Sequence, residues 1–94
     1  MDPATDGIFA ASDMIAMATL RMLHARGRRV PEDVAVIGLD DLRLASQTVP
    51  RLTTVRQDIA GGARKMVEAL QARIAGEDCP SAVMVPELVL RESA

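Results

Sequence analysis

The stretch Asp33–Asp41, DVAVIGLDD, decides the fold. Its segment Val34–Leu39 holds five apolar side chains in six residues, and two carboxylates, Asp40 and Asp41, follow directly. An unbroken β-branched and aliphatic run is typical of a strand covered on both faces, as in a parallel sheet. The stretch therefore predicts a buried strand that runs straight into a pair of negative charges.

The segments around this strand predict an open, mainly parallel α/β sheet with flanking helices. A short apolar run before a capped helix, and then the central strand, form the repeating pattern of such a sheet. The expected strands or extended runs are Ile8–Ala11, Val34–Leu39, Leu52–Gln57, Val83–Val85 and Leu88–Leu90, and the expected helices are Asp13–Arg26 and Ile59–Ala75. Residues 42–50 are expected to be irregular or a short helical turn, and a polar tail ends the chain.

Both predicted helices carry apolar stripes. In the first helix, Ala16, Leu20 and Leu23 share one face, and Met14, Met17 and Arg21 share another. A helix with apolar residues on two faces needs cover on two sides, which either neighbouring core elements or a second subunit can provide. The second helix has one stripe, formed by Ile59, Ala63, Met66, Val67, Leu70 and Ile74.

The composition excludes several classes of function. The chain has 94 residues, a net charge of −2, one cysteine and one aromatic residue. A basic patch that could neutralise phosphates is missing, so we expect no direct DNA contact by this segment. No apolar run approaches a membrane span of about 20 residues, and no secretory signal is visible at the start. The single cysteine cannot form an internal disulfide and fits a reducing compartment such as the cytoplasm.

The two adjacent carboxylates form the main candidate site. Ligands of open α/β sheets bind outside the carboxyl ends of the strands, where Asp40, Asp41, Ser12 and Asp13 are all expected. Neighbouring residues leave a strand on opposite sides, so one carboxylate can face a crevice while the other braces the loop. A free carboxylate suits a polyol such as a sugar, a pair suits Mg²⁺, and simple loop capping needs no ligand. No catalytic motif is present, and we expect neither an enzyme nor a cofactor.

Several segments together resemble the LacI/GalR family of bacterial transcription regulators. The run DGIFAASDMIAMATLRMLHARGRRVPEDVAVIGLDD resembles that family's pattern around its "SD" and "DD" pairs, PRLTTVRQDI resembles its hinge, and ELVLRES resembles its ending. The resemblance covers essentially the whole chain. It departs from the family at Leu39, where an aromatic residue is usual, and at Gly61–Ala63, where a hydrophobic residue and a glycine are usual.

The resemblance implies a domain like a type I periplasmic binding protein, whose two lobes close on a small effector, often a sugar. Effector binding then changes the DNA affinity of a separate N-terminal head. By this resemblance Asp40 binds the effector, Ser12 lines the pocket and Ile59 closes it. Asp13, Asp41 and Gln57 are assigned to loop support. Dimer contacts are expected at Met14, Met17, Arg21 and Thr48.

The resemblance also implies a division of the chain. Residues 1–56 are expected to belong to the C-terminal lobe, 57–80 to a helix of the other lobe, and 81–94 to a returning segment. The chain is then expected to be a C-terminal fragment that self-associates to cover the stripe of its second helix. Two alternatives remain: a fragment of a transporter's solute-binding protein with the same fold, and a Mg²⁺-dependent enzyme that uses Asp40 and Asp41.

Overall fold

A computed structural model describes residues 2–94, which form two compact units. One unit contains residues 2–56 and Glu87–Ala94, and the other contains Gln57–Pro86. Each unit has its own helix, and the sheet lies entirely in the first unit.

The sheet of the first unit has four strands in the order β1 (Gly7–Phe9), β2 (Ala35–Leu39), β3 (Thr53–Arg56) and β4 (Glu87–Val89). β1 pairs with β2, and β2 with β3, in parallel, whereas β4 pairs antiparallel with β3. This arrangement confirms the predicted open, mainly parallel α/β sheet. The parallel register places Leu39 beside Val55, so the carboxyl ends of β2 and β3 lie next to each other.

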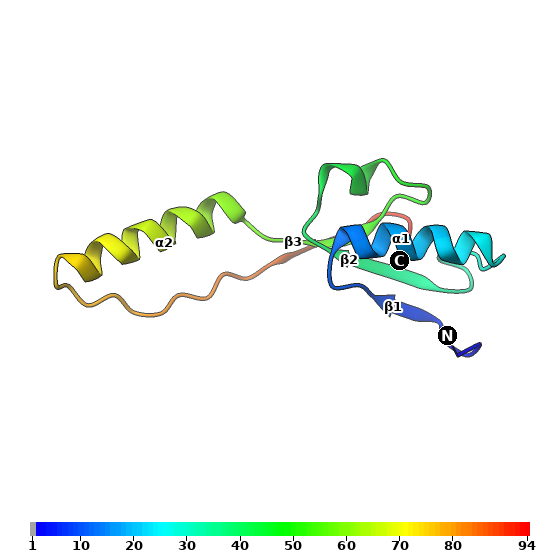
Figure 1. Cartoon of the computed structure of the whole chain (residues 1–94), viewed down its shortest axis with the longest axis horizontal. Coiled ribbons are helices and arrows are strands. Elements are labelled where there is room, and N and C mark those ends of the chain that lie inside the picture. Colours follow the sequence, from blue (N-terminus) through cyan, green and yellow to red (C-terminus); the bar gives the residue numbers. More distant parts are fainter. Residues whose placement is uncertain (1) are drawn as a thin grey trace. The chain divides into compact units, whose positions relative to one another are not determined.

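Helix α1 (Asp13–Ala25) packs on this sheet and supplies much of the core. Ser12 caps its N-terminus by accepting a hydrogen bond from the Ile15 N–H, and Gly27 follows its C-terminus with a φ of 72°. That left-handed conformation suits glycine, which has no Cβ. The predicted stripe of Ala16, Leu20 and Leu23 is buried, as expected. Figure 1 shows α1 lying against the sheet, where it contacts β2.

The central strand departs from its prediction on one face. Val36 and Gly38 are buried beneath α1, but Ala35, Ile37 and Leu39 on the opposite face are only half-buried. The strand is apolar on both faces, yet the described residues fully cover one of them. The apolar run predicted a strand covered on both faces, and the described residues fully cover only one of them.

The C-terminal residues are more ordered than a polar tail. Ser93 is buried, and its hydroxyl accepts a hydrogen bond from the Thr53 N–H at 2.8 Å and donates one to the Val36 carbonyl at 2.6 Å. The Val36 N–H in turn donates to the Ser93 carbonyl. The last residues therefore connect β2 and β3 through hydrogen bonds, which the description of this segment as a polar tail did not include.

The second unit consists of helix α2 (Ile59–Ile74) and the segment that follows it. Asp58 caps α2 by accepting a hydrogen bond from the Gly61 N–H, and Gly76 follows with a φ of 78°. No residue of α2 is buried, and its apolar stripe is open, with Ile59 69% and Leu70 60% exposed. The expected extended run at Val83–Val85 is not a strand, and β4 begins only after Pro86.

A short 3-10 helix, η1 (Arg43–Ser46), lies between β2 and β3, where an irregular stretch or a helical turn was expected. Ala45 on this turn is buried with the core, and its carbonyl accepts a hydrogen bond from the Leu52 N–H. The turn thereby fixes the start of β3 close to the loop that follows β2.

Candidate ligand-binding site

The loop after β2 has an unusual backbone. Asp40 has a φ of 121° and Asp41 a φ of 54°, both in the left-handed half of conformational space. Residues other than glycine rarely adopt positive φ values, although aspartate is enriched among those that do. Such conformations persist only where the surrounding structure holds them, and they gather at functional sites.

Asp40 is held by its backbone, and its side chain has no partner within the described chain. Its N–H donates to the Val55 carbonyl at 2.9 Å, so the residue stays attached to the end of β3. It is half-buried, and residues 2–94 offer no hydrogen bond or ion pair to its carboxylate. The carboxylate is therefore available to an external hydrogen-bond donor.

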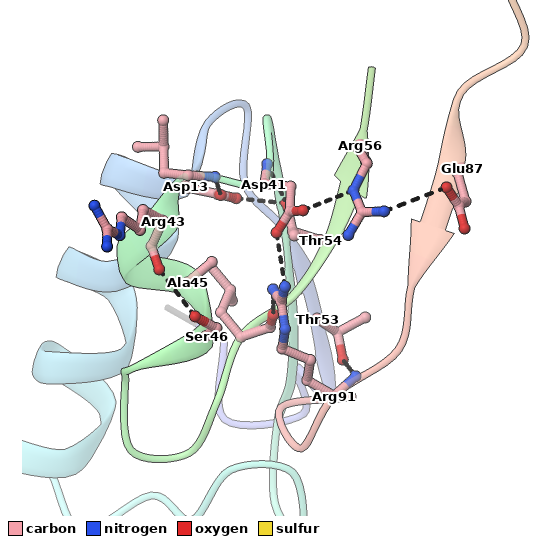
Figure 2. Close-up of polar contacts among 12 residues, drawn as sticks. Asp13, Asp41, Arg43, Ala45, Ser46, Thr53, Thr54, Arg56, Glu87 and Arg91 are labelled. Atoms are coloured by element: carbon pink, nitrogen blue, oxygen red, sulfur yellow. Dashed lines mark hydrogen bonds and ion pairs between the residues drawn. The ribbon is translucent and has the colours of Figure 1, made fainter. Parts of the chain in front are cut away.

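Asp41 contrasts with its neighbour, because both of its carboxylate oxygens are engaged. Oδ1 accepts a hydrogen bond from Arg91 Nη2 and Oδ2 accepts one from Arg56 Nε, each at 2.8 Å (Figure 2). Its N–H also donates to Thr54 Oγ1 at 3.3 Å. The Arg91 and Arg56 guanidinium groups hold the pKa of Asp41 below its usual range, with Arg91 the stronger influence.

Asp13 is the third carboxylate near this loop, and it is fully buried. Its Oδ1 accepts a hydrogen bond from Thr54 Oγ1 at 2.6 Å and its Oδ2 accepts one from the Leu42 N–H at 2.7 Å. Gly38 lies against Asp13 Oδ1 so closely that a Cβ at that position would collide with it. The start of α1 thus anchors the far side of the loop through Asp13, and the strand leaves room for it.

The first unit therefore brings Ser12, Asp13, Asp40 and Asp41 together at the carboxyl ends of the parallel strands β1 and β2. Ser12 is exposed, and its hydroxyl already accepts the Ile15 N–H at 3.2 Å as the cap of α1. Its Oγ–H can still donate to a ligand, because a hydroxyl has one donor and two acceptor positions. The arrangement presents one free carboxylate and one hydroxyl at the ends of β1 and β2.

Gln57 and Ile59 belong to the second unit and are described with it. Both residues are exposed, and they line a hollow of about 340 Å³ together with Met66 and Met84. The predicted role of Ile59 in closing a ligand pocket stays a prediction. Gln57 lies directly before the Asp58 cap of α2.

The residues predicted for a dimer contact come from two segments, and three of them meet. Met17, Arg21 and Thr48 line one surface hollow of about 460 Å³ with Leu20, His24 and Val49. Thr48 is fixed there because its hydroxyl donates to the Pro50 carbonyl at 2.7 Å. Met14 is not part of that lining, and it is 65% exposed on α1.

Two further features limit the chemistry of the described residues. Within residues 2–94, no three His, Cys, Asp or Glu side chains come together in a way that could hold a metal ion. The Asp40 and Asp41 pair is a poor cation site for a second reason, since two guanidinium groups already occupy the oxygens of Asp41. None of the described helices is long and apolar enough to span a membrane.

Sequence reasoning missed two arginines that shape this site, Arg56 and Arg91. Arg91 is separated from Asp41 by 50 residues, and no local pattern links the two. The available signal was a single arginine directly after the apolar run Leu88–Leu90. Its partner becomes clear only once β4 is paired beside β3.

Comparison with known proteins places the chain in a family. The family model of the periplasmic binding protein-like domain matches residues 2–94. Transcriptional regulator CelR of Thermobifida fusca is 46% identical over 93 residues, which are 97% of this chain and 27% of the relative. The chain thus spans about a quarter of the length of the curated relatives it matches.

Solved structures agree with this assignment. A CelR–cellobiose complex superposes with a TM-score of 0.89 at 45% identity, covering 98% of this chain and 29% of that one. A LacI-family regulator from Arthrobacter sp. FB24 in complex with lactose superposes with a TM-score of 0.81 at 40% identity, covering 98% and 36%. These relatives are named as transcriptional regulators, which favours the regulator over the transport-protein alternative. The chain belongs to the periplasmic binding protein-like domain family, and its homologues are LacI-family transcriptional regulators.

Proposed function

We propose that the chain forms part of the effector-binding domain of a sugar-responsive LacI-type transcriptional regulator in the cytoplasm, and that Asp40 binds the effector. The observation that carries the proposal is the contrast between Asp40 and Asp41. At the edge of the parallel strands, Asp41 is bound by two arginines while the Asp40 carboxylate stays without a partner in the described chain. An ionised carboxylate accepts hydrogen bonds from two hydroxyl groups at once, which suits vicinal sugar hydroxyls.

Relatives narrow the class of effector. The CelR structure contains cellobiose and the Arthrobacter structure contains lactose, and both superpose over nearly all of this chain. A disaccharide is therefore the first effector class to test. Ser12 would add a hydroxyl beside Asp40, and Ile59 would cover an apolar sugar face. In this proposal Asp13, Asp41 and Gln57 support the loops rather than contact the sugar.

Self-association is a second part of the proposal. The hollow formed by Met17, Arg21 and Thr48 joins α1 to the segment after η1, and Met14 adds exposed apolar surface to the same helix. Burial of such apolar surface against a second subunit would stabilise a dimer. The domain division at residues 56 and 80 belongs to the same proposal, with 57–80 contributing to the other lobe and 81–94 returning to the first.

The test is calorimetric titration of the full-length gene product with cellobiose, lactose and other disaccharides. Asp40→Asn should weaken binding by about 1–3 kcal/mol, since it removes a charge-assisted acceptor without changing its shape. The matched control is Asp33→Asn, because Asp33 lies before the same strand and, within residues 2–94, forms its ion pair with Arg29. Unchanged affinity in the Asp40 variant would refute the assignment of the site.

A further inference from the structure

Arg91 links the end of the chain to the loop that carries Asp40. Its Nη2 donates to Asp41 Oδ1 at 2.8 Å, while its Nη1 donates to the Leu52 carbonyl at 2.8 Å (Figure 2). Its own N–H donates to Thr53 Oγ1 at 2.8 Å. Hydrogen bonds thus hold the backbone of Arg91 at Thr53 in β3 and its side chain at Leu52, directly before β3, and the guanidinium points toward Asp41.

The two arginines that bind Asp41 differ in how firmly they are held. The side chain of Arg91 is 15% exposed and that of Asp41 12%, whereas Arg56 is 48% exposed. Arg56 also lies 3.6 Å from the exposed carboxylate of Glu87, so its charge is shared. Water and salt weaken exposed pairs far more than sheltered ones. Arg91 is therefore the main anchor of Asp41.

The loop needs such an anchor because of its backbone. Asp40 and Asp41 both have positive φ values, which residues with a Cβ adopt only under constraint. Hydrogen bonds hold the loop on three sides. The backbone N–H groups of Asp40, Asp41 and Leu42 donate to the Val55 carbonyl, to Thr54 Oγ1 and to Asp13 Oδ2, respectively. The Asp41 carboxylate also accepts hydrogen bonds from the two arginines. Among these partners, only the arginines hold the side chain of Asp41.

We infer that Arg91 is a positioning residue for effector binding, which acts through Asp41 to hold the loop in the conformation that leaves the Asp40 carboxylate free for a ligand. The inference rests on the proposed function, because it is Asp40 that would contact the sugar. Arg91 itself has no role as a sugar ligand in this account, since Leu52 and Asp41 already accept its side-chain hydrogen bonds.

A double-mutant cycle tests whether Arg91 acts through Asp41. In the full-length gene product, Arg91→Met and Asp41→Asn should each weaken cellobiose affinity roughly tenfold or more, as expected when a sheltered charged pair is broken. The double variant should be little weaker than Asp41→Asn alone, because Asp41→Asn already removes the ion pair with Arg91. Arg51→Met is the matched control, since Arg51 forms an exposed pair with Glu92 and does not contact the loop. Additive losses in the cycle would overturn the inference.

Amide hydrogen exchange provides a readout that does not depend on any effector. The Asp41 and Leu42 amides should lose protection in Arg91→Met and keep it in Arg51→Met. Arg91→Lys should lie in between, and it serves in place of Arg91→Met if that variant fails to fold. If cellobiose and lactose do not bind the unaltered protein, the sugar proposal fails while amide exchange still decides the role of Arg91. Unchanged loop protection in a folded Arg91 variant, or lost protection with unchanged affinity, would overturn the inference.

Discussion

The two helices of this chain have similar sequence patterns and opposite surroundings. Helix α1 buries Ala16, Leu20 and Leu23 against the sheet, whereas α2 buries no residue although its apolar stripe is longer. Amphipathic spacing shows which face of a helix requires a partner, but it does not show whether the same chain provides one. The difference explains why the first unit contains the core and the ordered loop, while α2 presents its apolar face.

The largest expected effect comes from the same substitution made in both helices. Leu23→Ala removes a fully buried side chain and should lower the free energy of unfolding by about 2–5 kcal/mol. Leu70→Ala should change it by less than about 0.5 kcal/mol in dilute solution, because its side chain is already exposed. Urea unfolding followed by circular dichroism measures both. A loss at Leu70 as large as at Leu23, and dependent on protein concentration, would show that a second copy covers α2.

A smaller effect is expected from the aspartates that begin the two helices. Asp13→Ala leaves the buried Thr54 hydroxyl and the part-buried Leu42 N–H without their acceptor, which should cost about 1–3 kcal/mol. Asp58→Ala removes one exposed capping bond of α2 and should cost about 1 kcal/mol or less. Both are measured by urea unfolding. Equal losses would mean that the hydrogen bonds from Leu42 and Thr54 to Asp13 contribute no more than the exposed capping bond of Asp58.

Features of the fold that depend on contacts within one helical turn could be predicted from the sequence, whereas features that depend on distant contacts could not. The limits of α1 and α2 were predictable to within one residue, because Ser12, Asp58, Gly27 and Gly76 act within a helical turn. The resemblance implied that the apolar stripe of α2 would need cover from outside this chain, and α2 buries no residue. That a second copy supplies the cover stays a prediction. The apolar runs and capped helices predicted the open α/β sheet. The DVAVIGLDD and RLTTVRQ segments also carried the resemblance to the LacI/GalR family.

The candidate site was predictable in part for the same reason. The position of Asp40 and Asp41 at the end of a buried strand follows from the hydrophobic run before them. The unequal surroundings of the two carboxylates depend on Arg56 and Arg91, which reach Asp41 only through the pairing of β3 with β4. Sequence spacing does not specify that register, so Arg56 and Arg91 could be identified as partners of Asp41 only from the structure.

The smallest expected effect is a dependence of the free energy of unfolding on pH, caused by Asp41 and Asp33 in the first unit. Arg91 and Arg56 lower the pKa of Asp41 below its ordinary 3.8 in the folded state. The unfolded state therefore binds a proton at higher pH than the folded state, and the stability from this group is lost as the pH falls below about 4. Asp33, whose pKa Arg29 lowers to about 2, adds to the same trend.

Asp41→Asn isolates the contribution of the loop to this pH dependence. The variant should be less stable than the unaltered protein at neutral pH. The difference should shrink as the pH falls below about 4, because the unfolded state then takes up a proton at Asp41 more readily than the folded state. Unfolding midpoints in urea between pH 7 and pH 2 measure the effect. A difference that stays constant over this range would contradict the ionic role of Asp41.

The most direct test of the central claim is a nuclear magnetic resonance titration of the full-length gene product with cellobiose and lactose. If the ends of the parallel strands bind the sugar, the amides of Ser12, Asp40 and Ile59 should shift in a saturable way. The amides of Asp33 and Val34, at the opposite end of the same strand, should stay unchanged. Saturable shifts confined to residues far from Asp40, or no shifts with any disaccharide, would contradict the account.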